Sequence, residues 1–142
     1  MAALLKILVV EDNREHLELT AYILKKNNVP GEVFVVRDGQ EAIDFLYRRN
    51  KFAEPAACPR PNLVLLDLNI PRVSGREVLR IMKSDEGLKD IPVVVVSTSN
   101  HEEDIAYARR FGASAYITKS GGFEQLTAAL AGIHLLASKD QP

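Results

Sequence analysis

The chain has 142 residues, which is enough for one domain with a substantial hydrophobic core and short for two. Hydrophobic residues make up 46% and charged residues 26% of the sequence, the balance of an ordinary soluble globular domain. The 18 Lys and Arg residues nearly balance the 19 Asp and Glu residues, so the net charge of -1 argues against a general affinity for nucleic acid or an anionic membrane.

Targeting and redox signals are also sparse. No apolar run approaches the length of a membrane span, and the N-terminus has no basic segment followed by a long apolar stretch. Cys58 is the only cysteine, which excludes an internal disulfide and favours a reducing compartment. We therefore expect a cytoplasmic protein with one domain over residues 1–142, a core at about 5–138 and a short tail at 139–142.

Strand patterns and helix patterns alternate along the chain. Short apolar, β-branched runs predict strands, and longer stretches with apolar residues on one face predict helices. In chain order the predicted elements are a strand at 6–10, a helix at 14–27, a strand at 32–36, a helix at 40–49, a strand at 63–66, a helix opening at 74–75, a strand at 92–96, a helix at about 101–111, a strand at 113–117 and a helix at about 122–137. Ser74 is the predicted N-cap of its helix, Gly112 ends the next one, and residues 50–62, with three prolines, form a long loop.

This alternation predicts the fold class. The strands at 6–10, 63–66 and 92–96 are apolar without alternation, which is typical of strands covered on both faces of a parallel sheet. The strands at 32–36 and 113–117 are less uniform and suit the edges. We predict an α/β fold with a five-stranded, doubly wound parallel sheet in the order 2-1-3-4-5 and helices on both faces.

Reactive side chains follow four of the five predicted strands. They are Glu11 and Asp12 after the first strand, Asp67 after the third, Ser97 after the fourth and Lys119 after the fifth. Because the carboxyl ends of parallel strands meet at one edge, these groups should share a cleft. Clustered carboxylates need a cation, and oxygen ligands suit magnesium. A carboxylate can accept a phosphoryl group, whose charge a metal ion, an ammonium and a hydroxyl would stabilise.

The ordered set of these blocks resembles the two-component response-regulator receiver domain. The blocks are Val9–Asp12, Leu65–Pro71 with Gly75, Val96–Thr98 and Tyr116–Lys119, and the resemblance covers essentially the whole chain. It implies the flavodoxin-like receiver fold. The loop before the third strand and the run Ser97–Asn100 are most similar to single-domain response regulators associated with phytochromes.

The resemblance implies a role for each matched residue. Asp67 matches the phosphoacceptor, and with Asp12, the backbone carbonyl of Asn69 and, through water, Glu11 it matches the ligands of Mg²⁺ or Mn²⁺. Lys119 matches the lysine that pairs with the phosphoryl group. Ser97 matches the hydroxyl that moves toward that group, and Tyr116 matches the aromatic residue that turns inward with it.

The function implied is that of a phosphoacceptor, not a conventional enzyme. A sensor histidine kinase, with a bacteriophytochrome as the candidate, would phosphorylate Asp67, and the domain would assist its own phosphorylation and dephosphorylation. The signal would change the surface of the helix at 101–111, the strand at 113–117 and the helix at 122–137. With no output domain expected after residue 137, this surface would bind a protein partner, and we predict a homodimer through it.

Two residues depart from the family pattern. Serine stands at Ser97 where threonine is usual, which keeps the hydroxyl, and Ser120 replaces the proline that usually follows the lysine. We predict a trans Lys119–Ser120 bond, because a cis bond before a residue other than proline costs about 2.5–4 kcal/mol. The three histidines, His16, His101 and His134, are expected to be ordinary helix residues.

Three alternatives compete with this interpretation. A phosphatase or phosphotransferase of the haloacid dehalogenase type generally wants a second acid two residues after its nucleophile, where this chain has Asn69. A phosphorylation-independent interaction module would keep the fold without the chemistry, which the intact Glu11, Asp12, Asp67 and Lys119 disfavour. A nucleotide-binding Rossmann domain would need a glycine-rich loop after the first strand, and none follows it.

Overall fold

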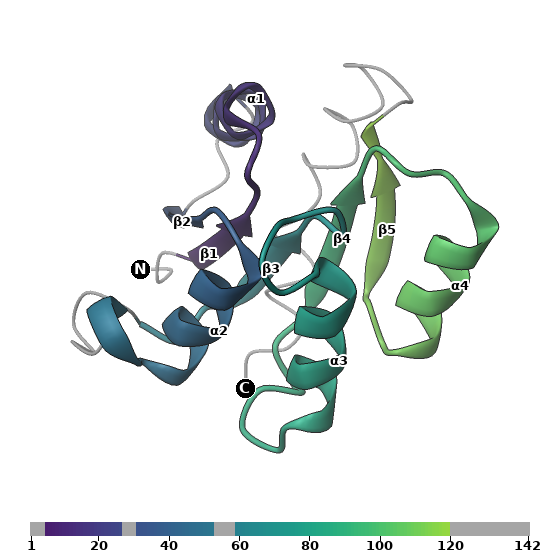
Figure 1. Ribbon diagram of the computed structural model, residues 1–142. Coiled ribbons are helices and arrows are strands. Elements are labelled where there is room, and N and C mark those ends of the chain that lie inside the picture. Colours follow the sequence, from purple (N-terminus) through teal and green to yellow (C-terminus); the bar gives the residue numbers. More distant parts are fainter. Residues whose placement is uncertain (1–4, 27–30, 53–58, 120–142) are drawn as a thin grey trace.

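The computed structural model describes residues 5–26, 31–52 and 59–119, which form a parallel sheet flanked by helices (Figure 1). The elements in chain order are β1 (Leu5–Val10), α1 (Arg14–Lys26), β2 (Gly31–Val36), α2 (Gly39–Tyr47), a 3-10 helix (Asn50–Phe52), β3 (Leu63–Leu66), α3 (Gly75–Ser84), β4 (Val93–Ser97), α4 (Glu102–Arg110) and β5 (Ala115–Thr118). The predicted helix at 122–137, Cys58, His134 and the Lys119–Ser120 bond lie outside the described residues. Within the described ranges, no helix has the length and apolar character needed to cross a bilayer.

The sheet has the predicted topology. Its strand order is β2-β1-β3-β4-β5, and all neighbouring strands run parallel. The two strands with less uniform sequences, β2 and β5, are its edges, as expected. In the register of the sheet, Val10 pairs with Leu66 and Ser97 pairs with Thr118. The residues that follow β1 and β3, and those that end β4 and β5, are therefore brought to the same edge.

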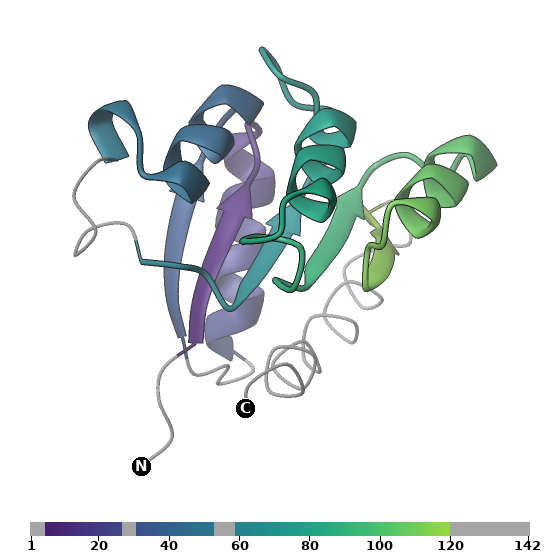
Figure 2. The same cartoon turned by 90° about the horizontal axis from the view of Figure 1, so that it is seen from below.

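Two apolar layers hold helices against the sheet, one on each face. Alternate strand residues, among them Leu8, Val64 and Val95, pack toward α2, α3 and α4. The residues between them, such as Val9 and Leu65, pack toward α1. Figure 2 shows α2, α3 and α4 side by side over one face of the sheet. Because β3 and β4 are buried at every position, their apolar runs need no alternation, which explains why the sequence pattern identified them.

Local signals account for the ends of most helices. The Ser74 side chain accepts a hydrogen bond from the backbone N–H of Glu77 at 3.2 Å, so the predicted N-cap is confirmed. Gly112 follows α4 with a φ of +91°, and its N–H donates to the carbonyl of Arg109 at 3.2 Å, which confirms the predicted stop.

The end of α2 was predicted incorrectly. The helix stops at Tyr47 instead of residue 49, because Arg48 turns into the left-handed region with a φ of 54°. Its N–H and that of Arg49 then cap carbonyls of the last helical turn. The chain continues into the 3-10 helix Asn50–Phe52, so the stretch expected to be an ordered or semi-ordered loop begins with a short helical turn. No glycine or proline marks this turn in the sequence, so propensity alone could not locate it.

Candidate functional site

Acidic and basic side chains meet at the carboxyl edge of the sheet. Glu11 and Asp67 extend β1 and β3, and the N–H of Asp67 donates to the carbonyl of Val10 at 3.1 Å, which places the two acids on adjacent strands. Lys119 follows β5 directly. Glu11, Asp67 and Lys119 are each 5–8% exposed in their side chains, so a charged cluster is buried here.

The Lys119 ammonium binds three groups in this cluster. Its Nζ donates to Oε1 of Glu11 in a short contact, to Oδ2 of Asp67 at 3.2 Å, and lies 3.0 Å from Nδ1 of His16. An ammonium carries three hydrogens, and each is directed at a partner from a different element. The lysine expected from the sequence is thus in contact with the aspartate expected to be the phosphoacceptor.

The three carboxylates fit a divalent cation. Each of Glu11, Asp12 and Asp67 offers an oxygen, and these oxygens lie within 4.8 Å of one another. Asp12 is exposed while the other two are buried, so the cluster is open to water on one side. Burial, with further contributions from neighbouring Asp67, raises the pKa of Glu11 to about 7, although Lys119 opposes the rise. Positive charge would relieve this unfavourable environment, and hard oxygen ligands with room for water suit Mg²⁺ or Mn²⁺.

The turn after β3 fixes the Asp67 side chain. Its Oδ1 accepts a hydrogen bond from the backbone N–H of Asn69 at 2.9 Å, while Oδ2 faces Lys119. Gly75 allows the start of α3 to approach this turn, because a Cβ there would lie 2.2 Å from the backbone oxygen of Asp67. The side chain of Asn69 is exposed. Asn69 therefore lies beside the acidic cluster, on the turn that orients Asp67.

Ser97 and Tyr116 both contact the loop between β4 and α4. Ser97 is fully buried, and its Oγ accepts a hydrogen bond from the N–H of Ser99 at 3.2 Å. The Tyr116 hydroxyl donates to the backbone carbonyl of Ser99 at 2.8 Å. The Ser99 hydroxyl in turn makes a short contact with Asp104 of α4. The hydroxyl and the aromatic ring expected to act together are thus connected through Ser99, which the sequence analysis did not single out.

His16 is the site residue that sequence reasoning missed. It lies in the first turn of α1, where it contacts Lys119 and stands 3.7 Å from Oε1 of Glu11. Burial, and after it the charge of Lys119, lower the pKa of His16 below its ordinary 6.5, which favours the neutral ring. One signal could have identified it. A helix that starts at the carboxyl edge of a parallel sheet directs its first turn toward the site. By contrast, His101 is exposed at the start of α4.

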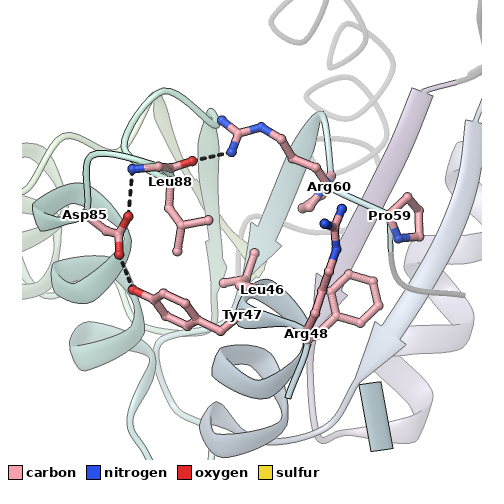
Figure 3. Close-up of a pocket in the computed structure, with 10 residues that line it drawn as sticks. Leu46, Tyr47, Arg48, Pro59, Arg60, Asp85 and Leu88 are labelled. Atoms are coloured by element: carbon pink, nitrogen blue, oxygen red, sulfur yellow. Dashed lines mark hydrogen bonds between the residues drawn. The ribbon is translucent and has the colours of Figure 1, made fainter. Parts of the chain in front are cut away.

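A second hollow lies between the end of α2, residues 59–61 and the loop after α3 (Figure 3). Its volume is about 240 Å³. The polar groups around it bind one another, since the Tyr47 hydroxyl donates to Asp85 and the Arg60 guanidinium donates to the carbonyl of Gly87. Residues 59–61 precede β3, at the opposite edge of the sheet from Asp67. This hollow is separate from the acidic cluster, and its partnered groups indicate a structural role.

Comparisons with known proteins agree with the observed fold. The family model of the response regulator receiver domain matches residues 7–131. The response regulator Rcp1 of Synechocystis sp. is 39% identical over 127 residues, which cover 89% of this chain and 84% of Rcp1. The crystal structure of the phosphorylated cyanobacterial phytochrome response regulator RcpA superposes with a TM-score of 0.86 and 43% identity, covering 99% of this chain and 98% of RcpA. The Mn²⁺-bound form of Rcp1 superposes with a TM-score of 0.82 at 39% identity, covering 91% of each chain.

Proposed function

The chain belongs to the response regulator receiver domain family, and from this premise we propose that Asp67 accepts a phosphoryl group from the phosphohistidine of a sensor kinase. The observation that carries the proposal is the buried contact of the Lys119 ammonium with Asp67 and Glu11. A phosphoryl group on Asp67 would add negative charge to a largely buried cluster that is open to water on the side of Asp12. The ammonium 3.2 Å from Oδ2 is positioned to compensate that charge.

The residues divide the chemistry among them. A carboxylate oxygen of Asp67 attacks phosphorus, a P–O bond forms, and the P–N bond to the kinase imidazole breaks. The N–H of Asn69 holds Oδ1 and so limits rotation of the carboxylate. Lys119 stabilises charge on the transferred group, and the buried Ser97 hydroxyl is the donor that would bind it afterwards. Later attack by water on phosphorus breaks the P–O bond to Asp67, releases inorganic phosphate and restores the carboxylate. The domain would thus assist both its phosphorylation and its dephosphorylation.

Magnesium or manganese is the cation proposed for this site. Asp12, Asp67 and the backbone carbonyl of Asn69 would hold it directly, and Glu11 would act through water. When bound, the ion neutralises charge on the transferring phosphoryl group. The Mn²⁺-bound form of Rcp1 supports this choice.

Signal output is proposed to follow from the loop after β4. Ser97 and Tyr116 both bind Ser99, so movement of the Ser97 hydroxyl toward a phosphoryl group would change the loop and release the tyrosine hydroxyl. That would alter the surface of α4 and β5, together with the predicted helix at 122–137, toward a protein partner. The similarity to RcpA and Rcp1 supports a kinase of the phytochrome type as the donor.

The test is phosphorylation by a small phosphodonor with magnesium, followed by intact mass measurement. The wild-type protein should gain the mass of one phosphoryl group. Loss of that group in acid would identify it as an acyl phosphate. Asp67→Asn should gain none, because an amide oxygen is a poor nucleophile. Asp38→Asn is the matched control, since that acid lies after β2, outside the cluster. Undiminished labelling of Asp67→Asn would refute the proposal.

A phosphatase of the haloacid dehalogenase type is less well supported. The position two residues after Asp67 is Asn69, whose side chain is exposed and cannot serve as a general acid. A phosphorylation-independent module would not need a buried lysine between two acids. Burying such charges is costly unless they are used or fully paired.

A further inference from the structure

We infer that His16 is a positioning residue for Lys119, in that its Nδ1 accepts one ammonium hydrogen and so holds the ammonium beside Asp67. The inference rests on the proposed function, because it assigns His16 a part in placing the charge that receives the phosphoryl group. The sequence pattern offered no such role for a histidine in α1.

The geometry defines what the imidazole does. Lysine has only hydrogens to offer, so a contact of 3.0 Å between Nζ and Nδ1 requires that Nδ1 accept and that the ring hydrogen reside on Nε2. The Lys119 side chain is 8% exposed, so water can do little to replace a lost partner. An unpaired hydrogen on a buried cation is costly, and His16 removes that cost.

The backbone of His16 is held close to the acidic cluster. The His16 N–H donates to Oδ1 of Asn13 at 3.0 Å, and the N–H of Asn13 donates to Oε2 of Glu11 at 3.2 Å. The first turn of α1 is thereby tied to the end of β1, where the acidic cluster begins. The backbone of His16 is therefore connected, through Asn13, to Glu11 of the acidic cluster.

His16 differs from the other partners of Lys119 in its charge. The two carboxylates that bind the ammonium are the groups proposed to take the phosphoryl group and to face the cation, so their interactions change during the reaction. Within the part of the chain that the structure describes, the other recorded partner of the ammonium is the neutral imidazole. An imidazole that accepts a hydrogen through Nδ1 and carries its own hydrogen on Nε2 has no net charge, so it neither attracts a cation nor repels a phosphoryl group. His16 thus provides a constant anchor on one side of Lys119.

The test compares three variants in two measurements. His16→Leu keeps bulk but removes the acceptor, and His16→Asn restores an acceptor near the position of Nδ1. His101→Leu is the matched control, because His101 is exposed at the start of α4 and its side chain makes no cap hydrogen bond. The first measurement is the NMR signal of the Lys119 ammonium in metal-free protein, which does not depend on phosphorylation. The second is the rate of phosphorylation by phosphoramidate with magnesium.

The expected pattern is specific to an acceptor. His16→Leu should lose or shift the ammonium signal and slow phosphorylation about tenfold, the factor expected for a hydrogen bond to a charged group. His16→Asn should recover most of both, and His101→Leu should match the wild type. An ammonium signal unchanged in His16→Leu, or no recovery in His16→Asn, would overturn the inference. If His16→Leu does not fold, His16→Ala replaces it in the same comparison.

The two proposals fail in different ways. Failure of the wild-type protein to become phosphorylated would refute the proposed function, while the ammonium signal would still decide whether His16 positions Lys119. Normal phosphorylation of every variant, with the ammonium signal unchanged, would refute only the role of His16.

Discussion

The three acids of the cluster differ in exposure, and this separates their roles. Glu11 and Asp67 are buried beside Lys119, whereas Asp12 is exposed and makes the open side of the cluster. A hydrated cation that approaches from solvent meets Asp12 first. Asp12 should therefore supply much of the metal affinity.

We predict that Asp12→Ala weakens magnesium binding by about 10–100-fold or more, since even indirect partners of metal sites contribute on that order. An NMR titration with MgCl₂ measures the affinity. Glu18→Ala is the control, because it removes the same charge from an exposed position on α1 that pairs with Arg14. Equal affinity in Asp12→Ala and wild type would argue against the proposed ligand set.

Tyr47 and Asp85 form a side-chain pair beside the second hollow. The hydroxyl of Tyr47, with the N–H of Gly87, lowers the pKa of Asp85 below its ordinary 3.8. A carboxyl whose pKa is lowered on folding stabilises the fold above its unfolded pKa, and this contribution is lost as the pH falls through the folded value.

Tyr47→Phe should therefore raise the pKa of Asp85 toward 3.8. The variant should also be less stable than wild type above that pH, with a difference that shrinks in stronger acid. Carboxyl NMR titration and urea unfolding at several pH values measure the two effects. Tyr22→Phe, at an exposed position of α1, is the control. An unchanged Asp85 titration would mean that the Tyr47 contact contributes little in solution.

At the scale of elements, the first turns of α3 and α4 are joined by one charged cluster. The Arg76 guanidinium pairs with the buried Asp104, and Arg76 also stacks on the Tyr107 ring at 5.2 Å. The Tyr107 hydroxyl donates to the carbonyl of Arg76 at 3.0 Å. Asp104 also accepts from Ser99, so the cluster extends to the loop that Ser97 and Tyr116 contact. The position of α4 is thus coupled to the loop between β4 and α4, which begins at the candidate site.

Arg76→Ala should destabilise the protein by about 1–2 kcal/mol, because the buried Asp104 loses its charged partner. The loss is no larger because the Arg76 side chain is 43% exposed, so that solvent screens the ion pair. Urea unfolding measures this loss, and faster amide exchange in α4 should accompany it. Arg80→Ala is the matched control on the same helix, since its pair with Glu77 is exposed on both sides and should matter little. Equal stability of the two variants would contradict a coupling role for Arg76.

At the scale of the whole molecule, β5 forms an incompletely covered edge in the described part of the sheet. Its four residues are all partly exposed. A hollow of about 250 Å³ lies between β5 and α4, lined by residues that include Ile105, Ala108 and Tyr116. An edge strand beside a hollow of mixed polar and apolar lining is a surface that a partner can cover. This is the described portion of the surface through which we predicted a homodimer.

We predict that light scattering will report a dimer at high protein concentration, with a larger dimer fraction after phosphorylation. Ile105→Glu should keep the protein monomeric, because it places a charge in the hollow. Tyr22→Glu makes a comparable change at an exposed residue on the other face and should leave the dimer intact. A monomer under all conditions would show that this surface does not serve self-association.

The layered fold and the residues at the carboxyl edge of the sheet could be predicted from the amino-acid pattern. Buried parallel strands must be apolar throughout, and alternating strand and helix patterns admit few topologies, so the order β2-β1-β3-β4-β5 followed. The same reasoning placed Glu11, Asp67 and Lys119 at one edge, because each directly follows a strand. The proximity of these three side chains therefore follows from the sequence pattern alone.

The contacts around this cluster depend on how distant parts of the chain pack together, and the amino-acid pattern did not predict them. Lys119 and His16 are 103 residues apart, and nothing periodic in the sequence relates them. The sequence pattern also did not predict the end of α2 at Arg48 or the ion pair between Arg76 and Asp104. Nor did it predict the hydrogen bond of Ser99 to Asp104. Buried apolar residues recur at regular intervals along a helix or strand, so they produce a periodic sequence pattern. A hydrogen bond between two side chains involves one residue from each of two elements, so it produces no such pattern.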